Sequence, residues 1–285
     1  MSVSHRRNRA SRALRRIVLT LACAAWPNPT GLALAQEHAS HSHGNGPLHF
    51  SHPLVTESPS PDDKVRFDYR LADEPGEDGE GGAVRHTLRL EAEYAFTPGL
   101  SLEVDAPYTF LDPDEGDARD RLDNVEVGLK YASFALARHG LLLGGGIEFG
   151  LPTGDAETGI GSNHVVEFEP FLDVGYQRGR WEIVGFTSFG IPLNENDEDE
   201  ADLELGWNTS VLRHLTPRLM LLLEFGGEHV FGGEEDGVNV VDVTPGFKVQ
   251  PLEDSGLQVG AGVSLPLTED EEFDVRPVVS IFYHF

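Results

Sequence analysis

From residue 64 to the C-terminus, apolar and polar residues alternate in 12 successive segments. In the first segment Val65, Phe67 and Tyr69 alternate with Arg66 and Asp68. A period of two is typical of a β-strand with one face in an apolar medium and the other in a polar one. The segments predict strands of about 8 to 13 residues each, long enough for tilted strands to cross a membrane. The alternating residues that mark these strands lie within 65–71, 88–96, 100–110, 125–131, 141–151, 166–176, 181–191, 203–211, 219–225, 241–249, 257–265 and 279–285.

The connections between these segments alternate between long polar loops and mostly short turns. The long ones are residues 72–84, 112–121, 152–163, 194–202, 232–239 and 268–274, and the others are 97–99, 135–140, 178–180, 214–217 and 250–256. Long external loops and short periplasmic turns are typical of bacterial outer-membrane barrels. The sequence therefore predicts an all-β protein, an antiparallel transmembrane β-barrel of about 12 strands over residues 64–285. An even number of strands would place both ends of the barrel on the periplasmic side.

A secreted, soluble β-sandwich is the competing fold, because its strands also alternate and are also joined by turns. Soluble strands average five or six residues, however, and the segments here are nearly twice as long. Ionised groups are also confined to one side of each segment. No run of 18 apolar residues follows residue 35, which excludes membrane-spanning helices in that region and leaves a closed barrel as the way to cross lipid.

The N-terminal residues predict two further regions. Residues 1–35 contain six arginines, an apolar run over residues 17–26 and the small-x-small sequence Ala33-Leu34-Ala35, which together indicate a cleaved secretion signal peptide. The only cysteine, Cys23, lies in that leader, so the exported chain is expected to have no disulfide. Residues 36–63 are rich in His, Ser, Pro and Gly and lack periodicity, which favours a disordered periplasmic arm.

The charge of the chain points to a cationic or neutral solute rather than nucleic acid. All 48 acidic residues follow Ala35, whereas six of the 21 basic residues precede it, and nucleic-acid binding needs clustered Lys and Arg. An excess of carboxylates on the inner face would make a channel prefer cations. The alternative is that these groups pair with one another inside a filled barrel. The pore-lining candidates are Glu91, Glu93, Glu103, Asp105, Glu126, Glu148, Glu167, Glu169, Asp173, Glu182, Glu204 and Glu224, with Lys130 and Arg89.

The histidines of the arm suggest an alternative role in copper or zinc binding or transport at the outer membrane. Imidazoles at short spacing can bind divalent transition metals, although such a tract is more often a soluble linker with incidental metal affinity. No other cofactor is predicted. The candidate ligands are His38, His41, His43, His49 and His52.

Two short sequences resemble known outer-membrane proteins. The final residues, with Ile281, Tyr283 and Phe285 alternating up to the terminus, resemble the C-terminal strand that the barrel-assembly machinery reads in such proteins. The run from Gly146 to Asp155, which ends Leu-Pro-Thr-Gly-Asp, resembles a strand-to-loop passage of the outer-membrane channel family named for meta-pathway phenol degradation. This resemblance implies passive transport of small solutes, aromatic or hydrophobic compounds among them. By itself the Pro-Thr-Gly-Asp sequence is an ordinary turn, with Gly154 expected to supply a positive φ.

Other side chains carry weaker predictions. Aromatic rings at the lipid interfaces of the barrel are expected at Tyr94, Tyr108, Tyr131, Tyr176, Trp181, Trp207 and Tyr283. The acidic loop 194–200 could bridge divalent cations to surface lipid, or could be a plain charged loop. No enzyme is predicted. The less favoured alternative, an outer-membrane lipid hydrolase, would have to use side chains that form no recognisable nucleophile motif: Ser188, Ser210, Ser280, His164, His229 and His284.

Overall fold

The computed structural model describes residues 47–76, 81–194, 202–233, 236–253 and 255–285. The predicted leader, residues 36–46 of the predicted arm with His38, His41 and His43, and most of the acidic loop 194–200 lie outside the described residues. Among the described residues, no helix is long and apolar enough to cross a membrane.

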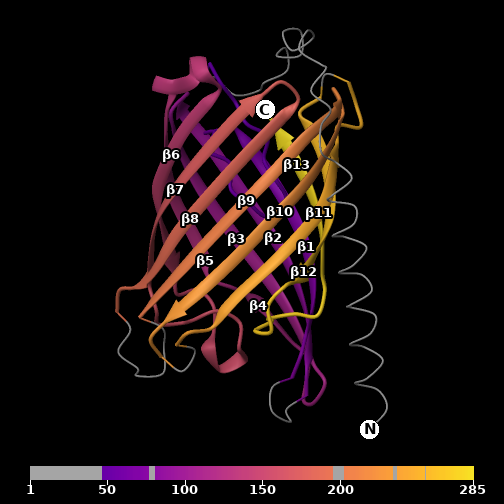
Figure 1. Cartoon of the computed structure of the whole chain (residues 1–285). Helices are drawn as coiled ribbons and strands as arrows, with labels where there is room; N and C mark the ends of the chain where they lie inside the picture. The colour runs from indigo at the N-terminus through magenta and orange to yellow at the C-terminus, as the bar shows by residue number, and fades with distance from the viewer. Residues whose placement is uncertain (1–46, 77–80, 195–201, 234–235, 254) are drawn as a thin grey trace. The chain divides into compact units, whose positions relative to one another are not determined.

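The described chain is built almost entirely from β-strands, joined by turns, loops and two short 3-10 helices, η1 (Phe134–His139) and η2 (Ala156–Thr158) (Figure 1). The strands are β1 (Lys64–Glu74), β2 (Ala83–Thr97), β3 (Leu100–Pro113), β4 (Arg119–Leu122), β5 (Val125–Ser133), β6 (Leu141–Leu151), β7 (Glu167–Arg178), β8 (Trp181–Pro192), β9 (Leu203–Thr216), β10 (Leu219–Phe231), β11 (Asn239–Val249), β12 (Leu257–Pro266) and β13 (Arg276–His284).

These strands form one closed antiparallel barrel. Apart from β4 and β5, each strand pairs with its neighbours along the chain. The barrel closes where β1 pairs with β13, with Val65 opposite Tyr283 and Phe67 opposite Ile281. Strands β4 and β5 both pair with β3 and are separated only by Asp123 and Asn124, so together they occupy one position in the barrel. The prediction of 12 strands is therefore confirmed. The β-sandwich alternative is wrong, because closure leaves a single sheet without free edges.

Several strands are longer than predicted. Strand β2 begins at Ala83 rather than Leu88, and β9 and β10 extend to Thr216 and Phe231. Residues 83–87 of β2 pair in register with β3, although apolar and polar residues no longer alternate there. Backbone hydrogen bonding in a hairpin does not depend on a lipid-facing side, so the pairing continues where the hydrophobic pattern ends.

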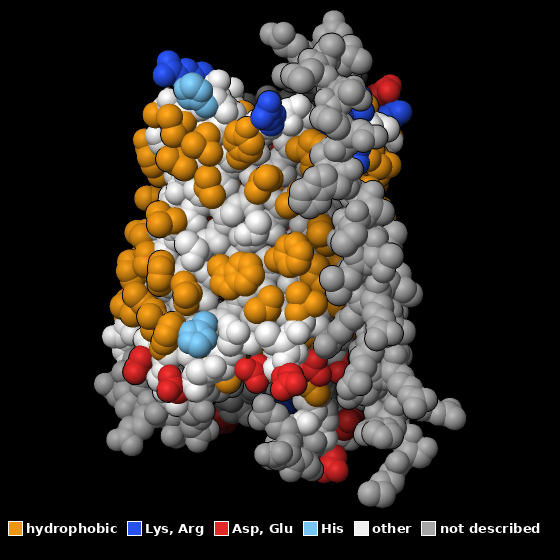
Figure 2. All heavy atoms as spheres, viewed as in Figure 1, with side chains coloured by type: hydrophobic (Ala, Val, Ile, Leu, Met, Phe, Trp, Pro, Cys, Tyr) orange, Lys and Arg blue, Asp and Glu red, His pale blue; other side chains and the backbone are white. Residues whose placement is uncertain are grey.

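The two faces of the wall differ in chemistry as the alternation predicts. Apolar side chains such as Phe67, Leu90 and Ile281 are exposed on the outside. On the face shown in Figure 2, hydrophobic side chains form a broad band. Acidic side chains gather below this band in the view of Figure 2, and Lys and Arg side chains above it. The polar positions of the same strands, such as Asp68, Glu91 and Ser280, are fully buried, which places them inside the barrel.

The structure corrects the prediction of a disordered arm for residues 47–63, here called the plug segment. The side chains of Phe50, Leu54, Ser58 and Asp62 are at most 1% exposed. They are covered by residues at the ends of the strands that meet at the short turns, among them Leu142, Leu212 and Phe282. We call the end of the barrel with the short turns the turn end, and the opposite end, with the long loops, the loop end. The plug segment therefore occupies the interior of the turn end.

Glycines on the inner face of the wall make room for the two apolar anchors of the plug segment. A Cβ atom at Gly175 of β7 would lie 2.7 Å from the Phe50 ring, and one at Gly260 of β12 would lie 2.5 Å from Leu54. The sequence does not predict these contacts, because Phe50 and Leu54 are isolated apolar residues in a segment without periodicity. A side chain that docks into a concave wall needs no repeating pattern of its own.

We expect Gly175→Ala to loosen the plug segment. The new methyl group would meet three atoms of the Phe50 ring within 2.8 Å, and overpacking of this kind destabilises by about 1–3 kcal/mol. The matched control is Gly128→Ala on the inner face of β5, where the nearest atom is 3.7 Å away. Limited proteolysis of the folded protein within residues 47–63 should be faster in Gly175→Ala only. Equal protection of the two variants would contradict the described fit.

Candidate solute path through the barrel

The polar anchors of the plug segment come from carboxylates on the inner wall. The Glu224 carboxylate accepts hydrogen bonds from the backbone N–H groups of Leu54, Val55 and Thr56 at 2.8–3.1 Å. The Glu182 carboxylate accepts one from the N–H of Ser51 at 2.8 Å. Three successive amides on one carboxylate satisfy buried donors that have no strand partner. Two of the predicted pore-lining acids therefore hold the plug segment in place.

Cations of the wall hold the carbonyl groups of the same segment. The Lys248 ammonium donates to the carbonyl oxygen of His52, and the Arg66 guanidinium to that of Leu54, each at 2.5 Å. Lys248 also lies over the Phe282 ring, 3.9 Å from its centroid. Both backbone donors and backbone acceptors of the plug segment are thus satisfied by side chains of the barrel.

A network of ion pairs fills the space between the plug segment and strands β1 to β5. The Lys64 ammonium lies 2.7 Å from Glu91 and 2.8 Å from Glu93. The Lys130 ammonium lies 2.5 Å from Glu57 of the plug segment and 3.3 Å from Glu103. Burial alone would raise the pKa of Glu57, but the nearby Lys130 and Lys64 hold it well below its usual range. Among the predicted pore-lining acids, Glu91, Glu93 and Glu103 are therefore paired with lysines inside the barrel, as the alternative to an open acidic pore expects.

Toward the loop end, the inner carboxylates have a different environment. Five of them are only partly buried, and among the described residues no Lys or Arg nitrogen lies within 4.0 Å of Glu126, Glu148, Glu167 or Glu169. We call the five the acidic wall: Glu126, Glu148, Glu167, Glu169 and Glu204.

The acidic wall is continuous across neighbouring strands. Glu148 of β6 lies directly opposite Glu169 of β7. Gly150 pairs with both Glu126 and Glu167, so these two acids flank a position without a side chain. A Cβ atom at Gly190 would lie 2.2 Å from the Glu167 carboxylate and 3.4 Å from the Cβ atom of Glu204. Inward glycines therefore give the carboxylates room along β5 to β9, which leaves a strongly negative inner surface.

The remaining predicted pore residues divide between these two regions. Arg89 pairs with Asp105 and reaches Glu91 at 3.9 Å, and Asp173 is buried beside Gly144 on the inner face of the wall. All the predicted pore residues therefore face inward, as their strand parity indicates. Their role in lining a pore is a functional prediction that burial does not test.

The Leu-Pro-Thr-Gly-Asp run is hydrogen-bonded at the loop end to residues 123–125, just before and at the start of β5. The Thr153 hydroxyl donates to the carbonyl oxygen of Asp123 and accepts from the N–H of Val125, both at 2.8 Å. The N–H of Gly154 donates to the Asn124 side chain at 3.2 Å. The positive φ expected at Gly154 is wrong, since the left-handed glycines of this loop are Gly159 and Gly161. Gly154 is needed for close approach, because a Cβ atom there would lie 2.6 Å from the Ile160 carbonyl oxygen.

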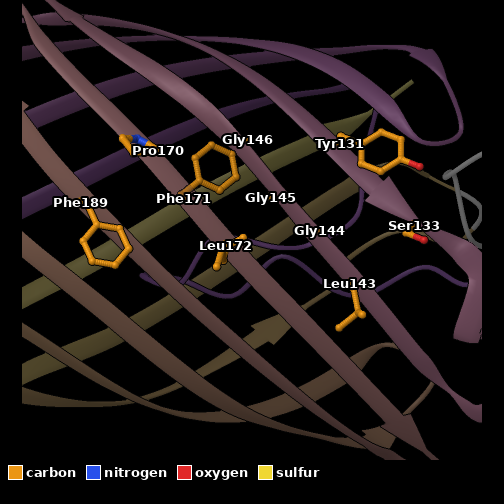
Figure 3. A pocket seen from close by; sticks show the side chains of 10 residues that line it. All are labelled: Tyr131, Ser133, Leu143, Gly144, Gly145, Gly146, Pro170, Phe171, Leu172 and Phe189. Carbon is orange, nitrogen blue, oxygen red and sulfur yellow. The ribbon is translucent and has the colours of Figure 1, made fainter.

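An apolar depression lies on the outside of the barrel over β5 to β8 (Figure 3). Gly145 leaves a gap between Leu143, Tyr131 and Leu172 on the outer side of the wall. On the inner side, the Phe171 ring covers the neighbouring Gly146, whose added Cβ atom would lie 2.5 Å from the ring. The depression is therefore separated from the interior by backbone and by this ring.

The structure also places the histidines and serines that were considered for metal binding or hydrolysis. His49 and His52 both lie at Asp62 inside the turn end, together with His284. The Ser210 hydroxyl donates to Glu224 at 2.6 Å, and the His229 ring stacks edge-on against Phe231. His164 lies in the loop after β6, beside Ser162. Of the residues weighed for a hydrolase, Ser188 and Ser280 lie within strands β8 and β13, while Ser210 and His284 contact different carboxylates.

Solved structures with the same architecture are outer-membrane barrels. A search of protein-family models and a search of curated proteins found no match. The COG4313 outer-membrane channel from Pseudomonas putida F1 superposes with a TM-score of 0.61 at 13% identity, covering 78% of this chain and 94% of the channel. The NanC porin gives a TM-score of 0.53 at 9% identity, and the KdgM porin, in complex with disordered oligogalacturonate, gives 0.50 at 11%. Each covers 78% of this chain, with 98% of NanC and 99% of KdgM matched. At these identities the likeness shows the fold, and the resemblance to the phenol-degradation channel family stays a prediction.

Proposed function

We propose that this protein is an outer-membrane channel for passive diffusion of small cationic or neutral solutes. Its apolar outer band would face membrane lipid, with the long loops outside the cell and the turn end in the periplasm. The channel and the two porins of the same fold support this proposal, and the apolar band supports membrane insertion with the help of the barrel-assembly machinery.

The acidic wall is the observation that carries the preference for cations. Its carboxylates are partly solvent-accessible, and among the described residues no Lys or Arg nitrogen lies within ion-pair distance of the four on β5 to β7, namely Glu126, Glu148, Glu167 and Glu169. In a space of low dielectric constant, fixed negative charges attract cations and repel anions. The paired carboxylates of the turn end contribute less, because Lys64 and Lys130 already neutralise them.

The plug segment limits what can pass. Its backbone groups contact side chains of β1, β8 and β10, and its apolar side chains pack against Phe282 of β13. We therefore take the turn end as the narrow part of the path. A solute must therefore pass alongside the plug segment, or pass only when the plug segment is displaced from the turn end. Small ions and small neutral molecules fit this restriction better than large substrates.

Single-channel recording in planar bilayers tests the proposal. In a KCl gradient, the reversal potential should have the sign of cation preference, and small neutral solutes should swell liposomes that contain the protein. Purified protein that migrates as a folded, heat-modifiable barrel yet produces no conducting events would refute the channel function. A reversal potential of the opposite sign would refute the preference for cations and leave the channel function standing.

A further inference from the structure

Three imidazole rings converge on one carboxylate inside the turn end. The Nε2 atoms of His49 and His52 lie 3.1 and 3.3 Å from Oδ2 of Asp62, and Nδ1 of His284 lies 2.7 Å from the same oxygen. The ligand atoms of His49, His52 and Asp62 all lie within 4.8 Å of one another. We call these four residues the histidine cluster. Three come from the plug segment and one from the last residue of β13.

The donor set of the histidine cluster is that of a transition-metal site. Three imidazole nitrogens with one carboxylate oxygen suit Zn²⁺ in tetrahedral coordination, and also Cu²⁺ or Ni²⁺. The ring nitrogens now share a single oxygen atom as their partner. An ion placed among them would let each nitrogen and the carboxylate bind through its own lone pair. Ligand atoms at 2.0–2.1 Å from a tetrahedral ion lie about 3.3 Å from one another, so the nitrogens would move apart from the shared oxygen and arrange themselves around the ion.

Neighbouring groups of carboxylates do not have this property. Glu57, Glu91 and Glu103 also bring ligand atoms close together, but Lys64 and Lys130 donate into that group. Its negative charge is neutralised by ammonium groups, so a metal ion would have to displace them. The histidine cluster instead offers neutral nitrogens and one carboxylate.

Binding of an ion requires one rearrangement of hydrogen bonds. Nδ1 of His52 lies 3.1 Å from the Lys64 ammonium, which has only hydrogens to donate, so the contact assigns the ring proton to Nε2. Metal ligation by Nε2 would move that proton to Nδ1, and Lys64 would rely on Glu91 and Glu93, which it already contacts. The site is reachable, because the His49 side chain is 16% exposed whereas the other three ligands are almost completely buried.

We infer that His49, His52, Asp62 and His284 bind one divalent transition-metal ion, with Zn²⁺ or Cu²⁺ as the fitting cations. The ion would join the plug segment to the C-terminal strand, since its ligands come from both. Metal binding would thus hold the plug segment in the barrel. This inference concerns a binding site and stands whether or not the barrel conducts solutes.

Metal titration of the refolded exported chain tests the inference. Zn²⁺ affinity is measured by competition with a chromophoric chelator, and Co²⁺ serves as a spectroscopic probe of tetrahedral coordination. Because His38, His41 and His43 could bind metal independently, the reference protein carries His38→Gln, His41→Gln and His43→Gln. We expect this reference to bind one tight equivalent with the visible absorption of tetrahedral Co²⁺.

Single substitutions in that reference locate the ion. His52→Gln and His49→Gln should each weaken Zn²⁺ binding at least about tenfold, or 1.4 kcal/mol, and remove the tetrahedral Co²⁺ spectrum. His139→Gln, in the exposed turn after β5, should leave both unchanged. Heat-modifiable migration confirms that each variant is folded, and the two plug-segment variants avoid the C-terminal strand that assembly depends on. A reference protein that binds no Zn²⁺, or variants that bind as tightly as the reference, would overturn the inference.

Discussion

Glu224→Ala is expected to release the plug segment and to raise single-channel conductance several-fold. The carboxylate accepts from the N–H groups of Leu54, Val55 and Thr56 and from the Ser210 hydroxyl. Its removal leaves buried donors unsatisfied, each at roughly 1–3 kcal/mol. Every 1.4 kcal/mol changes the population of a displaced state about tenfold. A plug segment held by such bonds would therefore spend a large part of the time outside its site.

Two control variants separate loss of the plug from loss of charge. Glu224→Gln removes the charge but keeps an acceptor oxygen, so conductance should rise less than in the alanine variant. Glu148→Ala removes an inward carboxylate of the acidic wall and should leave the plug segment protected from protease. If Glu224→Ala conducts like the wild-type protein while residues 47–63 become protease-sensitive, the plug segment is not the barrier to flow.

Replacing Glu148, Glu167 and Glu169 together by Gln is expected to abolish most of the cation preference. These three acids lie side by side on β6 and β7, and no Lys or Arg of the described chain compensates them at ion-pair distance. The variant should show a reversal potential close to zero in a KCl gradient. The wild-type preference should also shrink at high ionic strength, since the Debye length falls to about 3 Å at 1 M salt.

The matched control carries Glu157→Gln and Glu253→Gln, two exposed acids outside the strands. It should keep the wild-type reversal potential, because exposed charges in bulk water are strongly screened. If the triple variant folds normally and keeps the wild-type selectivity, the acidic wall is not the cause of the cation preference. The Glu224→Ala variant distinguishes the two regions further, since its conductance should change more than its selectivity.

The fold could be derived from the sequence because an apolar outer face and a polar inner face impose opposite demands on alternate residues of every strand. Leu90 and Glu91, or Val104 and Asp105, are adjacent in the chain and end on opposite faces of the wall. The closure between β1 and β13 follows from the same requirement, since an unpaired edge in lipid leaves backbone groups unsatisfied. Strand ends were less well predicted, because the hairpins remain hydrogen-bonded beyond the apolar band.

The state of the interior was decided only by the tertiary structure. Strand parity placed Glu224 and Glu148 alike on the inner face, yet Glu224 holds the plug segment and Glu148 belongs to a partly solvated acidic wall. The difference depends on which residues lie across the barrel, at separations of up to 170 positions for Leu54 and Glu224. A local pattern contains no information on such contacts.

The sequence by itself thus determined the barrel, its strand positions and the inward direction of its charges, since each follows from the solvent on the two sides of one strand. Only the tertiary structure decided that residues 47–63 lie inside the barrel and that His49, His52 and Asp62 meet His284 there. The physical reason is that the plug segment makes no repeating pattern. Its bonds are satisfied one by one by side chains of distant strands.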